Sequence, residues 1–242
     1  MPRRPPGSDA TSVWLRPAHA TRQPVPAFSR DEITRVAIEL ADQGGLEAVS
    51  MRRIAARIGS APTSLYWYFS DKDELYELMA DAVLGEIPLP EHPSGDWYAD
   101  LAAIARAVRT SLSRHSWYAQ IGIHPVAGPQ TRRFIVAAVR AFEGVGLSEQ
   151  TTADIFGAVN NYISGFIQRE AAWDRFAARA SAASTSPPGA PGADVITPEV
   201  LAARTQLSSD ASFEFGLRCL LDGIATHIAH TTGSATGNAS AS

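Results

Sequence analysis

The chain has 242 residues, of which 45% are hydrophobic, and its formal net charge is −4. This length is enough for one large or two small domains with a real core. Because the chain as a whole is not basic, a nucleic-acid surface would have to be a local patch. The single cysteine, Cys219, excludes an internal disulfide framework and a metal cluster built on cysteines. No apolar run has the length of a membrane span and the N-terminus lacks an apolar signal core, so we expect a cytoplasmic protein.

Residues 1–27 are rich in proline and small polar residues, which predicts a disordered arm. Its charged residues are Arg3, Arg4, Arg16 and Arg22 against Asp9 alone. A basic arm ahead of a DNA-binding domain can reach phosphates or the minor groove. A solvated extension without a role is the alternative.

A first helix is predicted over residues 29–43. Ser29 and Glu32 have the spacing of a capping box, and Gly44 follows the helix as a stop. The apolar residues that form its buried stripe are Ile33, Val36, Ala37 and Leu40.

The stretch from Ser50 to Lys72 has the pattern of two short helices joined by a turn. Met51–Ile58 is the first, with Ser50 as its N-cap and Gly59 as its stop. Pro62 opens the second, because proline in a first helical turn costs no backbone hydrogen bond. Two short helices joined by a glycine-containing turn predict a helix-turn-helix.

The surface chemistry of this stretch fits DNA, because phosphates are bound by cations and by hydroxyl donors. The cations are Arg52, Arg53, Arg57 and Lys72, and they oppose only Asp71. The hydroxyl groups come from Ser50, Thr63, Ser64 and Tyr66. The alternative is a small helical cluster that uses its aromatic residues as core.

A fourth helix is predicted from a Ser70 cap to about Gly85, with Lys72 in its first turn. A cation there opposes the helix dipole, which favours a role outside the helix such as a phosphate contact. The proline-rich residues 86–96 then predict a boundary between domains.

The remaining chain has helical periodicity, with no alternating strand pattern and no Rossmann glycine fingerprint. We therefore predict an all-α protein. Helices are expected at about 97–114, at 151–173 and at 210–230, and a further helix is expected to end at Gly146. A broken segment is expected at 116–128, a flexible loop at about 178–196 and a disordered tail at 233–242.

Residues 28–87 resemble the DNA-binding domain of the TetR family of bacterial transcriptional repressors. The most specific match is the run LYWYFSDKDEL, in which Leu65, Tyr66, Tyr68, Phe69, Lys72 and Leu75 fill the family pattern. The resemblance implies an N-terminal three-helix domain with the helix-turn-helix at 28–87 and a larger ligand-binding and dimerisation domain at 96–232. The DNA-contacting residues expected are Arg30, Ser50, Arg52, Thr63, Ser64, Tyr66, Trp67, Tyr68 and Lys72.

The second domain resembles the tetracycline-repressor branch of this family over residues 146–172 and 213–224. The resemblance implies that these two helices form a four-helix bundle with their mates in a homodimer. Gly216 and Gly223 lie seven residues apart on one helix face, which favours close helix approach at a dimer seam. Tight packing within one subunit is the alternative.

The other helices of that domain are expected to enclose a small molecule, with mostly apolar and a few polar groups. The candidate lining residues are Trp117, Tyr118, Ile121, His124, Phe134, Phe156, Asn160, Phe166 and Trp173. Tetracycline repressors hold a drug–magnesium chelate through a histidine five residues before a proline. Anchored on Pro125, that position is Gln120 here, and His124 adjoins the proline instead. We therefore expect a metal-independent ligand and no cofactor.

These observations predict a ligand-responsive repressor, a homodimer on a palindromic operator that a small-molecule inducer releases. An activator or a co-repressor-dependent regulator is the alternative. An all-helical small-molecule-binding protein or enzyme is a further one, but the six histidines have no evident nucleophile or metal-ligand spacing. We expect no enzyme activity and no membrane partner.

Overall fold

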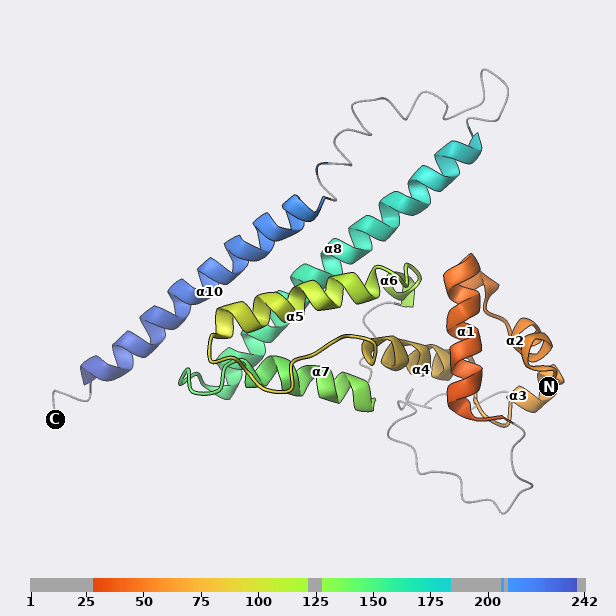
Figure 1. Ribbon diagram of the computed structural model, residues 1–242, viewed down its shortest axis with the longest axis horizontal. Helices are drawn as coiled ribbons and strands as arrows, with labels where there is room; N and C mark the ends of the chain where they lie inside the picture. Colours follow the sequence, from red (N-terminus) through yellow and green to blue (C-terminus); the bar gives the residue numbers. More distant parts are fainter. Residues whose placement is uncertain (1–27, 122–127, 184–205, 207–208, 239–242) are drawn as a thin grey trace, which may run out of the picture. The chain divides into compact units, whose positions relative to one another are not determined.

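The computed structural model of the chain describes residues 28–121, 128–183, 206 and 209–238 (Figure 1). Every regular element in these ranges is a helix, so the predicted all-α fold is confirmed. The predicted arm at 1–27 and His124 lie outside the described residues. The helices pack into two compact units, which are described separately below.

Unit 1 contains residues up to Ile87 together with Arg114–Ile135. Its elements are α1 (Arg30–Gly44), the 3₁₀ helix η2 (Leu46–Ala48), α2 (Met51–Ile58), α3 (Pro62–Leu65), α4 (Lys72–Leu84), α6 (Tyr118–Ile121) and the start of α7 (Pro129–Arg140). The segment 114–135 therefore packs with the N-terminal helices, although it follows the proline-rich residues 86–96 in sequence. The domain limits expected from the sequence, 28–87 and 96–232, stay a prediction.

The helix-turn-helix forms where the sequence predicts it. The Ser50 hydroxyl accepts from the backbone N–H of Arg53 at 3.3 Å and so caps α2. Gly59 ends α2 in the left-handed conformation, with φ +71°, which glycine adopts without a steric penalty. Leu65 and Phe69 are buried, as predicted. The second helix is shorter than expected, since α3 ends at Leu65 and hydrogen-bonded turns continue to Phe69.

The cap of α4 is Asp71, so the predicted Ser70 cap is wrong. The Asp71 carboxylate accepts from the Glu74 N–H at 2.9 Å, and the Glu74 carboxylate accepts from the Ser70 N–H at 2.7 Å. This is a capping box shifted by one residue, with a carboxylate in place of the hydroxyl. Lys72 occupies the first helical position, as expected.

The segment 114–135 is tied to α1 and α4 by buried polar groups. Trp117, which is fully buried, donates its Nε1–H to the Asp42 carboxylate at 2.6 Å. The His115 ring lies between two carboxylates, with Nδ1 2.8 Å from Asp42 and Nε2 3.2 Å from Glu86. The ring thereby connects the end of α1 with the residues that follow α4.

Unit 2 contains residues 88–113 and 136 onward. Its helices are α5 (Trp97–Leu112), the second half of α7, α8 (Glu149–Ala183) and α10 (Asp210–Asn238). Helices α8 and α10 lie side by side and run in opposite directions (Figure 1). Helix α8 continues past Ala178, where the loop was predicted to begin, because Ala and Arg are strong helix formers. Helix α10 likewise covers residues 233–238, which were predicted to belong to a disordered tail.

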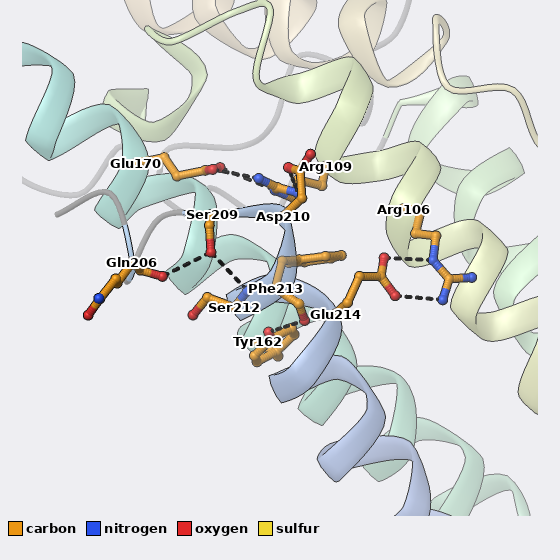
Figure 2. Close-up of polar contacts among 10 residues, drawn as sticks. All are labelled: Arg106, Arg109, Tyr162, Glu170, Gln206, Ser209, Asp210, Ser212, Phe213 and Glu214. Atoms are coloured by element: carbon orange, nitrogen blue, oxygen red, sulfur yellow. Dashed lines mark hydrogen bonds and ion pairs between the residues drawn. The ribbon is translucent and has the colours of Figure 1, made fainter. Parts of the chain in front are cut away.

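Arg109 joins three helices of unit 2 (Figure 2). Its guanidinium packs against the rings of Phe166 and Phe213, at 4.9 and 4.7 Å from their centroids. It donates to Glu170 of α8 at 2.7 Å and to Asp210 of α10 at 2.8 Å. A weakly hydrated, planar cation is well suited to a position against aromatic rings.

Gly216 makes a close approach within the chain. A Cβ at this position would overlap the hydroxyl of Tyr162, which donates to the Phe213 carbonyl at 2.7 Å. The packing alternative is therefore correct for Gly216. Gly223 has open space around it, so no such contact accounts for that residue.

Candidate functional site

A groove of about 400 Å³ lies on the helix-turn-helix. Its walls come from the start of α2, from α3 and from the start of α4, and its lining residues are Val49, Ser50, Met51, Arg52, Pro62, Tyr66, Lys72 and Leu75. Four of the nine residues predicted to contact DNA therefore lie together around one concavity: Ser50, Arg52, Tyr66 and Lys72.

The groove combines the groups that hold a phosphate. Arg52 and Lys72 are exposed and bring positive charge from two different helices. The first turn of α2 presents backbone N–H groups, and a helix N-terminus attracts anions. Such a set of cations and N–H donors positions a nucleic-acid backbone without reading its sequence.

Two aromatic side chains project beside the groove. Tyr66 is 61% exposed and Trp67 is 78% exposed, and among the large apolar side chains that the structure describes only Phe215 of unit 2, at 63%, is comparably exposed. Thr63 is exposed and Ser64 is half-buried on the neighbouring α3. Large aromatic groups that no core contact covers are typical of a binding surface.

Arg30 and Tyr68 are engaged inside unit 1. Arg30 donates to the Tyr68 carbonyl at 2.6 Å and to Glu74 at 2.7 Å. The Tyr68 hydroxyl accepts from the N–H of Phe28 at 3.3 Å. These contacts hold the turn that follows α3 against the beginning of α1, and DNA contact by Arg30 and Tyr68 stays a prediction.

Glu74 is a structural residue of this surface that sequence reasoning missed. Its carboxylate is only 5% exposed and binds both Arg30 and the N–H of Ser70. The third residue after the true cap, Asp71, is the usual position for a capping-box glutamate. Correct placement of that cap would have revealed it.

The predicted ligand-lining residues fall into different units. Trp117, Tyr118, Ile121 and Phe134 belong to unit 1, whereas Phe156, Asn160, Phe166 and Trp173 belong to unit 2. The segment 114–135 groups with α1 and α4, and the expectation that these residues line one ligand site stays a prediction. Burial, together with the charge of Asp81, raises the pKa of Tyr118 to about 12, so its phenol stays neutral.

In unit 2, Phe166 is a core residue. It is 3% exposed and contacts the ring of Phe213 edge-on at 5.1 Å. Phe156, Asn160 and Trp173 are half-buried on α8, and the Trp173 ring lies 5.6 Å from that of Phe176. Ligand contact by these residues stays a prediction.

Neither a metal cluster nor a membrane span is found in the part of the chain that the structure describes. No three His, Cys, Asp or Glu side chains are grouped there to hold a metal ion. None of the helices in the described ranges is long and apolar enough to cross a membrane. Gln120, at the position that the tetracycline repressors fill with a histidine, is exposed.

Two family models match the chain. Residues 33–79 match the bacterial regulatory proteins of the tetR family, and residues 89–228 match the tetracyclin repressor-like C-terminal domain. The first range contains α2 and α3, and the second contains all of α5 and most of α10.

Curated relatives include two transcriptional regulators from actinobacteria. An HTH-type transcriptional regulator of Saccharopolyspora erythraea is 36% identical over 165 residues, which are 67% of this chain and 69% of the relative. The HTH-type transcriptional repressor DrrR1 of Streptomyces coeruleorubidus is 31% identical over 155 residues, and the match spans 63% of this chain and 57% of the relative.

The fold matches solved structures as well. The apo structure of ActR from Streptomyces coelicolor superposes with a TM-score of 0.67 at 23% identity, over 86% of this chain and all of that one. At this identity the likeness concerns the fold. Both halves of the chain match the models of one family, and the first relative matches across two thirds of the chain. The protein belongs to the TetR family of bacterial transcriptional regulators.

Proposed function

We propose that the protein is a homodimeric repressor that binds a palindromic operator and leaves it when a small molecule occupies the C-terminal unit. The observation that carries this proposal is the groove of the helix-turn-helix. Arg52 and Lys72 border it, and Tyr66 and Trp67 extend from it into solvent. This combination serves phosphate contact and base contact on one surface.

The reading of a palindrome requires two copies of this surface. One short helix contacts few base pairs, and a symmetric dimer places two such helices one turn of DNA apart. The expected contacts are divided by role. Arg52, Lys72 and the start of α2 bind phosphates, while Thr63, Tyr66 and Trp67 reach base edges.

Helices α8 and α10 offer a surface for the second copy. Gly165 and Gly223 are exposed, with open space around each. Phe215, on the same helix as Gly223, is 63% exposed. Small residues let helix backbones approach closely, and an exposed aromatic adds apolar area to an interface.

Structural neighbours support the DNA and ligand parts of the proposal. BioQ, with a TM-score of 0.59 and 22% identity, was solved with its double-stranded DNA operator. ActR was also solved in complex with actinorhodin. We infer a small organic ligand for this chain too, bound without a metal ion, and a site of action in the cytoplasm where the DNA is.

The direct test is selection of double-stranded DNA from a random pool by the purified protein, followed by mobility shifts at two salt concentrations. We expect a palindromic sequence, with affinity that falls steeply as salt rises because bound phosphates release counterions. A folded protein that enriches no sequence from the pool contradicts the repressor function.

The homodimer has its own test. Gly223→Leu puts a large side chain where the seam requires a small one, and we expect monomers in sedimentation and a large loss of operator affinity. Ala211→Leu, at an exposed position on the first turn of the same helix, is the matched control. A Gly223→Leu protein that remains dimeric would place the interface elsewhere.

A further inference from the structure

A buried carboxylate of α4 caps the N-terminus of α7. Asp81 is 3% exposed, and its Oδ1 accepts from the N–H and from the hydroxyl of Thr131, both at 2.9 Å. Its Oδ2 faces the Gln130 N–H at 3.3 Å. These N–H groups belong to the first turn of α7, where a negative charge is favourable.

The start of α7 requires this cap from outside. Gly128, which precedes the helix, has no side chain with which to cap it, and Pro129 at the first position has no N–H. A Cβ on Gly128 would overlap the Asp81 carboxylate. The absence of a side chain at Gly128 therefore leaves room for the Asp81 carboxylate.

Helix α7 supplies a cap to α4 in return. Arg133 donates from Nη2 to the Ile87 carbonyl at 2.7 Å and to the Gly85 carbonyl at 3.3 Å. These carbonyls follow the last turn of α4, which has no basic residue of its own. A cation at a helix C-terminus complements the dipole, so each helix provides the charge that the other one lacks.

The position of this pair of caps in the chain gives it a role. Helix α7 is one continuous helix, yet its residues up to Ile135 belong to unit 1 and those from Val136 belong to unit 2. A displacement of the end of α4 is therefore expected to displace the start of α7, a helix whose later residues belong to unit 2.

We propose that Asp81, Gly128 and Arg133 form a reciprocal cap clamp that fixes the end of α4 to α7 and carries the coupling between the operator and the C-terminal unit. All three are positioning residues. The proposal rests on the proposed function for its operator, but the clamp itself has a readout in the free protein.

The first experiment measures backbone hydrogen exchange of the full chain without DNA. Asp81→Asn removes the charge and offers an amide to the Gln130 N–H, and Gly128→Ala displaces the carboxylate. We expect each variant to speed exchange about tenfold, both in the first turn of α7 and at the end of α4, as loss of a charged cap does. Faster exchange in α7 alone would contradict the proposal that the caps of α4 and α7 depend on each other.

Arg133 tests the other half of the clamp. Arg133→Gln is expected to speed exchange at Gly85–Ile87 and at the start of α7, while Arg133→Lys keeps a cationic donor and most of the protection. Arg132→Gln, one residue earlier and exposed, is the control for lost charge. If hydrogen exchange is as fast in Arg133→Lys as in Arg133→Gln, Arg133 does not act as a cap.

The second experiment uses DNA as the effector, because coupling between two sites is reciprocal. DNA selected from the random pool should slow exchange at Val136–Arg140 about threefold in the wild-type protein. At saturating DNA this response should vanish in Asp81→Asn and Gly128→Ala. It should persist in Asp96→Asn, which alters a cap of α5 that lies within one chain segment.

The outcomes separate the two proposals. A response that is equal in the wild type and in the clamp variants overturns the clamp while the regulator stands. If no DNA is selected, the proposed function fails, and the exchange of the free protein still decides whether the two caps act together.

Discussion

In the helix-turn-helix of unit 1 the capping contacts span three residues, from Ser50 to Arg53 and from Asp71 to Glu74. In unit 2 several polar contacts join distant parts of the chain. Arg109 reaches Asp210 across 101 residues, and the Tyr98 hydroxyl reaches Asp222 across 124. Local caps make a surface that short sequence motifs encode. Long-range pairs make a bundle whose partners a motif does not reveal.

The difference is tested most strongly at Arg109. Arg109→Ala removes the cation that pairs with Glu170, which is 19% exposed, and a group that packs against the rings of Phe166 and Phe213. We expect the free energy of unfolding to fall by about 3 kcal/mol in urea denaturation. Arg140→Ala, which breaks an exposed pair with Glu143, should cost less than about 0.5 kcal/mol. Equal losses would remove the special role of Arg109.

The DNA surface should show the opposite profile, with large losses of affinity and unchanged stability. Tyr66→Ala and Lys72→Ala are each expected to weaken operator binding by about tenfold, since each removes one good contact. Lys72→Ala should also lower the slope of affinity against salt by about one. Mobility shifts at several salt concentrations measure both quantities. Wild-type affinity in both variants would show that these residues do not contact DNA.

The cap of α4 tests a short-range contact of unit 1. Asp71→Ala should reduce the free energy of unfolding by about 1 kcal/mol, because the Glu74 N–H loses its acceptor. Asp71→Asn, which keeps a side-chain oxygen as an acceptor for that N–H, is the matched control. Thermal unfolding of the two variants compares them. An Asp71→Asn protein that loses as much stability as Asp71→Ala would contradict the capping role.

The smallest effect is expected at the exposed pair of unit 2. Arg106 donates to both carboxylate oxygens of Glu214, and this hydrogen-bonded pairing lowers the pKa of Glu214 (Figure 2). A lowered carboxyl pKa adds stability above the ordinary glutamate range, and that stability is lost as pH falls through the folded value. Glu214→Gln should reduce the loss of unfolding free energy between pH 7 and pH 3 by well under 1 kcal/mol, because solvent screens the pair. Urea unfolding at pH 7 and pH 3 checks the difference, and a variant that loses as much stability in acid as the wild type would contradict it.

The sequence predicted the helix-turn-helix closely because its signals are local. Ser50, Gly59 and Pro62 each mark a helix end by a property of one residue. The cap of α4 was misplaced by one position because Ser70 and Asp71 are both good caps. Composition also misjudged the ends of α8 and α10, where small residues continue a helix that was predicted to stop.

The division of the ligand candidates could not be predicted in the same way. Trp117 and Tyr118 have the apolar character of a pocket wall, but Trp117 is held by Asp42, which lies far away in sequence. Nothing near Trp117 in sequence indicates that its indole binds the end of α1. Pairings of this kind follow from the tertiary structure alone.

The segment 114–135 has a consequence for exchanging domains between regulators. A fragment cut at the proline-rich boundary would keep the buried Asp81 carboxylate and lose the Thr131 groups that donate to it. A buried acceptor without donors is costly, so such a fragment would be a poor module for a chimeric sensor. A hybrid that responds to a new molecule should take Arg114–Ile135 together with the DNA-binding helices, and place its junctions in α7 and after α5.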